Sequence, residues 1–237
     1  MKLGILDTVY KKDIIDGERE AEKFVKLLQL ANAPFEYHFY HVAEGEFPPS
    51  PEECDAFLVT GSPQGVYDQD EWIALLGDFI RRAYAANRKL VGICFGHQMI
   101  ANSLGGMARK SEKGWGLGLR PFQVHVPKPW MMPNLDTCTL NFIHQDQVVT
   151  LPDGAELLAG NDHCPNAMLS IGNQVFTMQG HPEYLPDAME TLLHYVGEHD
   201  GLEVEDALTS LAKAQPDTQI VAQWIVNFLQ YGEEVEA

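Results

Sequence analysis

Short apolar segments alternate with longer segments of helical periodicity through the first half of the chain. Three of them have the length and apolar character of strands buried in a parallel sheet, namely residues 3–6, 56–60 and 89–93, and a further strand is indicated at 35–42 by alternation with β-favouring aromatic residues. Between them, residues 21–31 and 69–87 place apolar side chains on one face of a helix. Strands that alternate with helices predict a parallel sheet covered by helices on both faces.

The pattern changes after a short helix that we expect at 96–104. The segments that follow are rich in glycine, proline and β-forming residues, and they predict an antiparallel extension of the sheet. These segments are 114–126, 140–148, 156–159, 167–171 and 174–178. Helical patterns at about 186–199, 203–213 and 217–231 finish the chain. We therefore expect an α/β fold in one domain, residues 1–237, with a mostly parallel central sheet, flanking helices, an antiparallel extension and a helical C-terminal extension from about residue 186 to 237.

Composition and charge narrow the classes of function. Hydrophobic residues make up 45% of the chain and charged residues 21%, values typical of a globular protein that buries a core. The 34 acidic residues outnumber the 16 basic ones and give a formal net charge of −18. Such a charge repels nucleic-acid phosphates and anionic membrane surfaces, so we expect no nucleic-acid partner.

Neither a membrane nor a metal is indicated. The apolar stretch at the N-terminus is too short for a signal peptide, and no apolar run is long enough to span a membrane. We therefore expect no membrane partner and a cytoplasmic location. The four cysteines are widely spaced, which favours free thiols over a disulfide framework and gives no zinc-binding pattern. We expect no metal and no cofactor.

Cys94 is a candidate nucleophile. Gly92-Ile93-Cys94-Phe95-Gly96 has the Gly-x-Cys-x-Gly pattern of a nucleophile elbow, and it stands where a buried strand passes into a helix. At such a turn the glycines allow neighbouring backbone to come close. The positive end of the helix favours a thiolate, and the Phe95 amide is directed at any oxyanion formed by attack of the sulfur. Alone, the pattern is also compatible with a small buried cysteine.

A general base and its orienting carboxylate are indicated by the run Gln179-Gly180-His181-Pro182-Glu183. Pro182 favours an extended conformation for His181, and residues two apart in extended chain project to the same side. Glu183 can therefore hold one imidazole nitrogen while the other addresses Cys94. On its own this run also fits a surface turn with a solvated ion pair. The rival base, His97, has no carboxylate nearby in sequence, and we interpret it as a packing histidine.

Two further positions border the expected site. Gln98 lies one helical turn after Cys94 on the same side, where its amide can hold a polar substrate. The segment that contains Gly61 and Ser62 closes an earlier strand and is expected beside the elbow, at the sheet edge where α/β folds bind ligands. Its backbone can give a second donor to an oxyanion, although a plain Ser-Pro turn would have the same sequence.

Together these motifs resemble the class I, triad-type glutamine amidotransferase family, and the resemblance runs from the first strand to about Tyr184. In that family the cysteine of a Gly-x-Cys-x-Gly-x-Gln elbow attacks the side-chain amide of glutamine, and a His-Pro-Glu motif completes the triad. The resemblance implies a flavodoxin-like fold, a triad of Cys94, His181 and Glu183, and an oxyanion hole at Ser62 and Phe95. It also implies substrate contacts, and these are at Gly61, Gln98, Gln145 and Asp146.

The resemblance leaves the substrate open. Ser62 stands where the family often has glycine, and Gly180 where many members have an aromatic residue, so a γ-glutamyl pocket of altered shape is expected. One hypothesis is hydrolysis of glutamine, with the ammonia passed to a partner such as a synthase subunit. The other is a stand-alone γ-glutamyl peptidase that acts on glutathione-like compounds.

Two interpretations lie outside this class. A cysteine-dependent α/β-hydrolase shares the elbow, but in that fold the acid precedes the histidine, whereas Glu183 follows His181. A non-catalytic regulatory module would normally lack Cys94, His181 or Glu183, and all three are present. The sequence therefore favours an enzyme.

Overall fold

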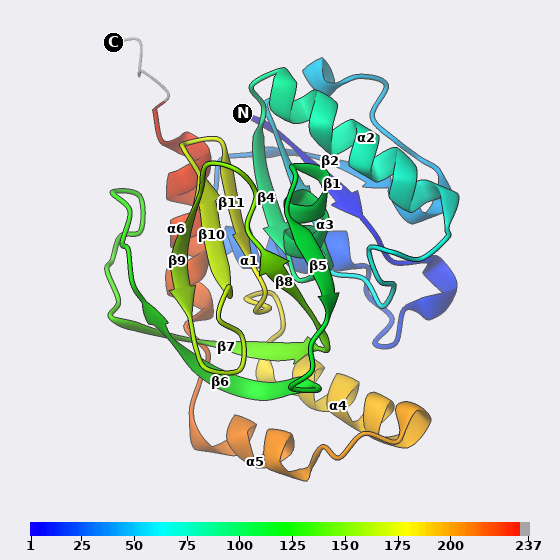
Figure 1. Ribbon diagram of the computed structural model, residues 1–237, viewed down its shortest axis with the longest axis vertical. Coiled ribbons are helices and arrows are strands. Elements are labelled where there is room, and N and C mark those ends of the chain that lie inside the picture. Colours follow the sequence, from blue (N-terminus) through cyan, green and yellow to red (C-terminus); the bar gives the residue numbers. More distant parts are fainter. Residues whose placement is uncertain (233–237) are drawn as a thin grey trace.

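A nine-stranded mixed sheet forms the centre of the protein, whose computed structural model describes residues 1–232. The strand order is β2-β1-β3-β4-β11-β10-β9-β6-β7 (Figure 1). The first five strands in this order, β2, β1, β3, β4 and β11, pair in parallel. The pairings from β11 through β10, β9 and β6 to β7 are antiparallel. The strands are β1 (Lys2–Asp7), β2 (Glu36–His41), β3 (Ala56–Val59), β4 (Lys89–Ile93), β6 (Gly116–Val124), β7 (Thr137–His144), β9 (Ala155–Gly160), β10 (Met168–Ile171) and β11 (Val175–Met178). The predicted fold class is confirmed.

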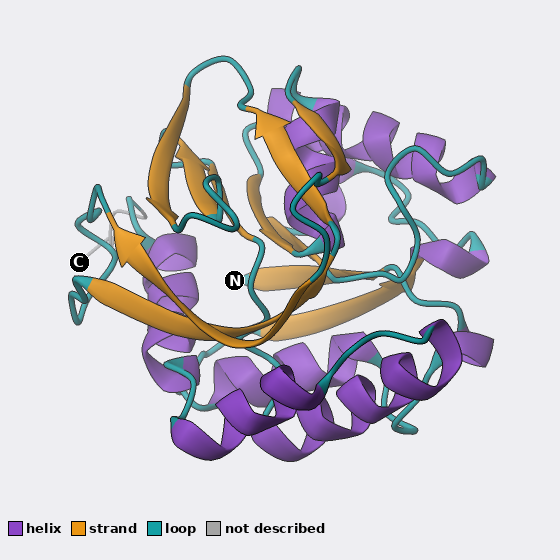
Figure 2. Cartoon of the chain, turned by 60° about the horizontal axis from the view of Figure 1, so that its bottom comes forward, coloured by secondary structure: helices purple, strands orange, loops and turns teal. Residues whose placement is uncertain are grey.

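Helices cover both faces of the parallel strands, as Figure 2 shows. On one face α1 (Glu20–Gln29) and α6 (Thr218–Gln230) pack together against side chains such as Ile5. On the other, α2 (Glu71–Ala85) and α3 (Phe95–Ser103) pack against side chains such as Leu6. Adjacent residues of a strand point to opposite faces, so the apolar runs of β1, β3 and β4 are buried on both sides, whereas β2, at the edge of the sheet, stays partly exposed.

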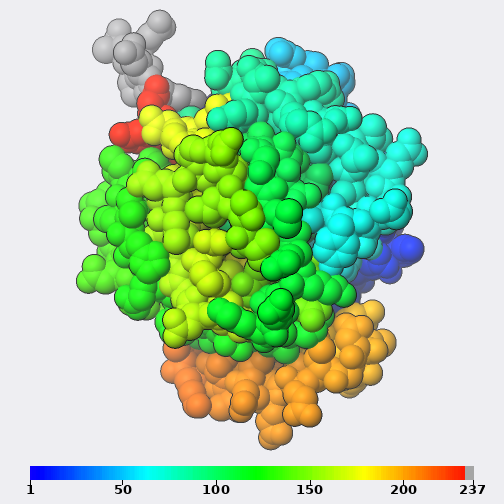
Figure 3. Space-filling view, viewed as in Figure 1, coloured from blue at the N-terminus to red at the C-terminus, as the bar shows by residue number. Residues whose placement is uncertain are grey.

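The chain after β11 forms a helical protrusion and then returns to the sheet. Helices α4 (Pro186–Asp200) and α5 (Glu205–Lys213) pack on β6 and enclose a small apolar cluster that includes Tyr184 and Met189. They stand out from the body of the molecule at the bottom of Figure 3. Of the expected C-terminal extension, α6 is part of the main core, where Trp224 is fully buried. Residues 233–237 of that extension lie outside the described residues.

Two parts of the extension differ from the expected pattern. Residues 174–178 are predicted in the antiparallel extension, but β11 pairs in parallel with β4, and only its other neighbour, β10, is antiparallel. No helical pattern directly precedes this segment, so the alternation that indicates parallel strands does not reach it.

The second difference lies at the segment 140–148. Residues 140–148 were expected to form one strand, but the chain changes partner at Gln145. Strand β7 ends at His144, and β8 (Asp146–Thr150) pairs with β5 (Met107–Lys110) in a separate two-stranded sheet. Strand β5 has only one buried residue among four, so the sequence carries too little apolar pattern to reveal it. The break brings residues 144–146 to the carboxyl end of the parallel strands.

The remaining expectations concern thiols and membranes. All four cysteines are free and buried, as expected. Among residues 1–232, no helix has both the length and the apolar character that crossing a bilayer requires. The cytoplasmic location stays a prediction.

Candidate active site

Cys94 stands in the sharp turn between β4 and α3. Its backbone has φ 51° and ψ −104°, a region that residues with a side chain rarely occupy. The two glycines of the motif make the turn possible: a Cβ atom on Gly96 would lie 2.2 Å from the Val59 carbonyl oxygen, and one on Gly92 would lie 2.5 Å from the Gly96 carbonyl oxygen. The structure therefore contains the strained elbow that the sequence predicted.

His181 and Glu183 follow the neighbouring strand, β11. Because β11 runs parallel to β4, with Met178 beside Ile93, the chain segments after both strands emerge at the same sheet edge. His181 Nδ1 lies 2.6 Å from Glu183 Oε1, and the two side chains are 3% and 0% exposed. The carboxylate accepts from Nδ1 and thereby leaves Nε2 as the nitrogen available to Cys94.

The electrostatics of His181 favour its charged form. Burial alone would lower the pKa of His181, but the negative charge of Glu183, the proximity of Cys94 and the hydrogen bond to Glu183 raise it well above its usual value. An imidazolium held beside a sulfur stabilises the thiolate, which is the nucleophilic form of cysteine.

The loop after β3 lies against this pair. A Cβ atom on Gly61 would be 3.0 Å from His181 Cε1 and 3.7 Å from Cys94 Cβ. Ser62, the residue after Gly61, fixes the loop by two hydrogen bonds. Its Oγ lies 2.7 Å from the Thr8 carbonyl oxygen and 2.8 Å from Gln64 Oε1. Phe95 is the first residue of α3, so its amide belongs to the first turn and has no partner within the helix. The predicted residues Gly61, Ser62 and Phe95 thus adjoin Cys94 along the chain or in space.

Gln98 has a different set of contacts from the one expected. It is buried, and its Nε2 donates to the Asp146 carbonyl oxygen at 2.9 Å and to Gln179 Oε1 at 3.0 Å. The amide nitrogen is therefore bound within the protein rather than open to a substrate. Gln98 links the nucleophile helix to the segment around Asp146, where Gln145 also borders the site.

Gln179 is a site residue that the sequence analysis did not single out. Its Nε2 lies 3.4 Å from Cys94 Sγ and donates to it, while its Oε1 accepts from Gln98. A chain of hydrogen bonds thus runs from the sulfur through two glutamines to the Asp146 backbone. The signal was present, because the alternation that puts His181 and Glu183 on one side of an extended segment puts Gln179 there too.

The other candidates for chemistry are buried and neutral. His97 is fully buried with Nδ1 2.8 Å from Thr177 Oγ1, and burial lowers its pKa to about 3, as expected for a packing histidine. Burial and the nearby Cys94 raise the pKa of the Cys164 thiol to about 12, and burial also raises those of Cys54 and Cys138. These thiols are therefore poor nucleophiles.

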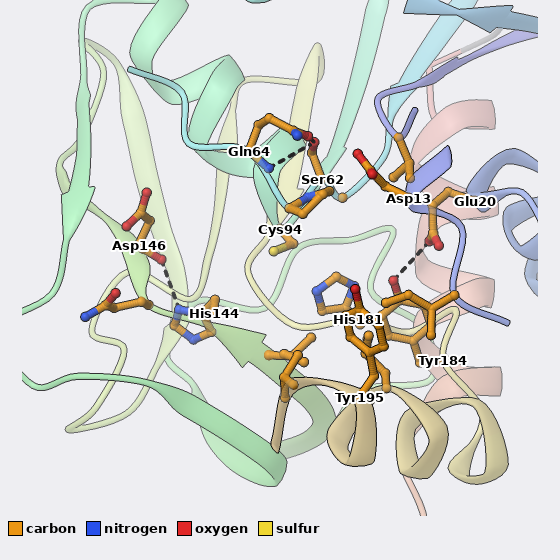
Figure 4. A pocket seen from close by; sticks show the side chains of 18 of the residues that line it. Asp13, Glu20, Ser62, Gln64, Cys94, His144, Asp146, His181, Tyr184 and Tyr195 are labelled. Carbon is orange, nitrogen blue, oxygen red and sulfur yellow. Dashed lines mark hydrogen bonds between the residues drawn. The ribbon is translucent and has the colours of Figure 1, made fainter. Parts of the chain in front are cut away.

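A cavity of about 600 Å³ opens above Cys94. Figure 4 shows His144 and Asp146 on one side of Cys94 and His181, Tyr184, Glu20 and Tyr195 on the other. All nine predicted site residues except Phe95 and Glu183 border this cavity, and those two adjoin Cys94 and His181 respectively. A concave site with a nucleophile and convergent polar groups is the usual form of an enzyme active site.

Comparison with known proteins defines the family. Residues 10–195 match the family model described as glutamine amidotransferase class-I. The chain belongs to this family. Its fold is also that of a solved glutamine amidotransferase from Thermotoga maritima, with a TM-score of 0.75, 16% identity and coverage of 97% of this chain and 96% of the other. A solved putative GMP synthase component from Thermoplasma acidophilum shares the fold with a TM-score of 0.64, 16% identity and coverage of 98% and 95%.

Curated relatives include gamma-glutamyl peptidases and putative glutamine amidotransferases. The chain is 31% identical over 206 residues to gamma-glutamyl peptidase 3 of Arabidopsis thaliana, covering 82% of this chain and 83% of the relative. It is 32% identical over 240 residues to gamma-glutamyl peptidase 4 of the same plant, covering 96% and 93%. Family and relatives together indicate hydrolase activity.

The elbow geometry predicts a strong effect of one added methyl group. Gly96→Ala should destabilise the protein by about 3 kcal/mol, because the new Cβ overlaps the Val59 carbonyl and the strand or helix must move. Urea unfolding measures the difference. The control is Gly17→Ala, where φ is +80° but nothing lies within 4 Å, and where only about 1 kcal/mol of backbone strain is expected. Equal losses at both positions would contradict close packing at the elbow.

The His181–Glu183 pair predicts a titration shift. Glu183→Gln removes the negative charge that stabilises the imidazolium, so the pKa of His181 should fall, and the neutral form should appear at lower pH than in the unmodified protein. NMR titration of the imidazole nitrogens measures the pKa of His181 in both proteins. Glu190→Gln removes the same charge from a side chain that is 61% exposed on α4 and should leave His181 unchanged. An unshifted His181 in Glu183→Gln would refute the pairing.

Proposed function

We propose that the protein hydrolyses γ-glutamyl amide bonds through a γ-glutamyl thioester on Cys94. The observation that carries this proposal is the strained Cys94 turn facing the buried His181–Glu183 pair at the base of the cavity. A nucleophile, a base and a group that orients the base are the parts that covalent hydrolysis needs. The family and the peptidase relatives support the same class of reaction.

In the first half of the reaction the Cys94 thiolate attacks the γ-carbonyl carbon of the substrate. The carbonyl oxygen becomes an oxyanion, which the Phe95 and Ser62 backbone amides stabilise. The His181 imidazolium gives its proton to the leaving nitrogen, the carbon–nitrogen bond breaks, and an amine departs. Glu183 keeps the imidazole in place and stabilises its charge, and Gln179 donates to the sulfur whenever it carries negative charge.

In the second half water replaces the amine. His181, now neutral, takes a proton from a water molecule that attacks the thioester carbon. The carbon–sulfur bond breaks, glutamate leaves, and both the thiolate and the imidazolium are restored. The backbone around Gln145 and Asp146, held by Gln98, is our candidate for binding the α-amino and α-carboxylate groups of the γ-glutamyl part.

The volume of the cavity favours a γ-glutamyl peptide over free glutamine as the substrate. Its volume of about 600 Å³ lies within the range of pockets that hold drug-sized ligands, so room remains after a γ-glutamyl group is placed beside Cys94. The peptidase names of the relatives support this choice. The second candidate is hydrolysis of glutamine with transfer of ammonia to a partner synthase, and the fold shared with the GMP synthase component favours it.

One assay separates these candidates and tests the nucleophile. The purified protein should release glutamate from γ-glutamyl dipeptides with a higher kcat/KM than from glutamine, and Cys94→Ala should lower kcat about 10⁴-fold or more. Cys54→Ala is the control, because that buried thiol lies outside the cavity lining and should leave kcat unchanged. Turnover of glutamine alone would favour the ammonia-transfer candidate.

The same assay tests the base. His181→Ala should be nearly as damaging as Cys94→Ala. His97→Asn should retain most of the kcat of the folded protein, because His97 is fully buried and outside the cavity lining. A larger loss at His97 than at His181 would mean that the base is wrongly assigned.

The Gln179 contact gives a separate prediction. Gln179→Met keeps the size of the side chain but removes the donor to sulfur, and it should lower kcat about tenfold or more, as expected for a hydrogen bond to a charged group. The control is Gln174→Met, which also loses buried amide hydrogen bonds, to the Tyr84 and Arg88 carbonyl oxygens, but at the opposite end of β11. Equal kcat values in the two variants would remove Gln179 from the reaction.

A further inference from the structure

The cavity extends well beyond Cys94 on the side of the catalytic imidazole. Its wall there consists of the segment before α1, which contributes Ile15, and one face of α4. The α4 residues recur at helical spacing and thus form one stripe along the helix; they are Ala188, Thr191, Leu192, Tyr195 and Val196. This half of the cavity is continuous with the space above the nucleophile.

The proton transfer in the proposed reaction indicates which part of a substrate occupies this half of the cavity. His181 must give its proton to the leaving nitrogen, so the leaving group lies on the His181 side of Cys94. Tyr184 stacks on the His181 ring with centroids 4.6 Å apart and planes at 19°, and its hydroxyl donates to Glu20 at 3.2 Å. The residues beyond His181 therefore surround the leaving amine, while Asp146, whose carbonyl accepts from Gln98, lies on the opposite side of Cys94 with the γ-glutamyl part (Figure 4).

Apolar surface is open to solvent at this end. Ile15, from the segment before α1, and Tyr195, from α4, both line the cavity, and each is 39% exposed. The Tyr195 ring is held in place by His199, with ring centroids 4.1 Å apart and planes at 18°. An aromatic ring that is already ordered loses little conformational freedom when it contacts a ligand.

The charged groups of this end do not offer a free cation for a carboxylate. Lys23 Nζ lies 2.6 Å from Glu20 Oε1 and 2.9 Å from Asp16 Oδ2, so two carboxylates already neutralise it. Asp13 and Asp200 also border the cavity and add negative charge. A leaving group with a carboxylate is therefore disfavoured here, and the attraction for an uncharged leaving group comes mainly from the apolar wall.

We propose that Ile15 and Tyr195 form a leaving-group subsite, which makes the protein prefer γ-glutamyl amides whose amine carries an aromatic or bulky apolar group. This inference rests on the proposed function and specifies its substrate class. The γ-glutamyl side of the cavity positions the scissile bond beside Cys94. Binding of the apolar group between α4 and the 13–16 segment then stabilises the transition state further.

Two substrates with uncharged side groups on the leaving amine test the subsite. L-γ-Glutamyl phenethylamide and L-γ-glutamyl ethylamide share the γ-glutamyl part and lack a second carboxylate, and they differ by one phenyl ring. We expect a kcat/KM ratio of about tenfold or more in favour of the phenethyl compound, as burial of an aromatic ring predicts. In Tyr195→Ala and Ile15→Ala the ratio should fall severalfold, because each variant removes one wall of the subsite.

The controls separate this inference from the proposed function. Leu75→Ala removes an apolar side chain that is 45% exposed on α2, outside the cavity lining, and should leave the ratio unchanged. Thermal unfolding of each variant confirms that it is folded. A ratio near one, or an unchanged ratio in both Tyr195→Ala and Ile15→Ala, overturns the subsite while Cys94-dependent turnover of the ethyl compound still stands. Turnover that survives Cys94→Ala overturns the proposed function itself.

Discussion

The parallel pairing of β4 with β11 is the contact on which the site depends. Met178 lies beside Ile93, and the Cys94 amide donates to the Met178 carbonyl oxygen at 2.9 Å, so the two strands end in register. The residues just beyond them belong to separate parts of the sequence, yet they emerge next to each other at one sheet edge. A shift of two residues in this pairing would move His181 about 7 Å from its position beside Cys94, since a strand rises about 3.3 Å per residue.

Burial explains why His181 and Glu183 form a hydrogen-bonded pair rather than standing as isolated side chains. An isolated imidazolium in the protein interior would be strongly destabilised, and so would an isolated carboxylate. Contact between His181 and Glu183 at 2.6 Å offsets this desolvation, and the nearby sulfur adds a second negative charge. The same low exposure that makes the groups costly to charge also strengthens their attraction, because little solvent screens it.

The sequence predicted most of the fold, since buried strands and amphipathic helices carry strong periodic patterns. The parallel sheet of the first half and the approximate bounds of most segments follow from such patterns, and glycine spacing predicted the turn at Cys94. The strand order and the parallel pairing of β11 with β4 were not predicted, because they depend on contacts between distant segments. The small sheet formed by β5 and β8 was missed because its strands are short and largely exposed. Contacts such as Gln179 to Cys94 and Gln98 to Asp146 join residues far apart in the chain, and one sequence records no such distances.

The position of α4 and α5 between Glu183 and the core helix α6 has a consequence for how the chain can vary. These two helices pack on β6 and on each other, whereas the strands that carry Cys94 and His181 are covered on one face by α1 and α6 and on the other by α2 and α3. Insertions, deletions and replacements within residues 186–213 can therefore accumulate without disturbing the strand order. Changes in one peripheral segment would therefore reshape a wall of the cavity without moving the strands that carry Cys94 and His181.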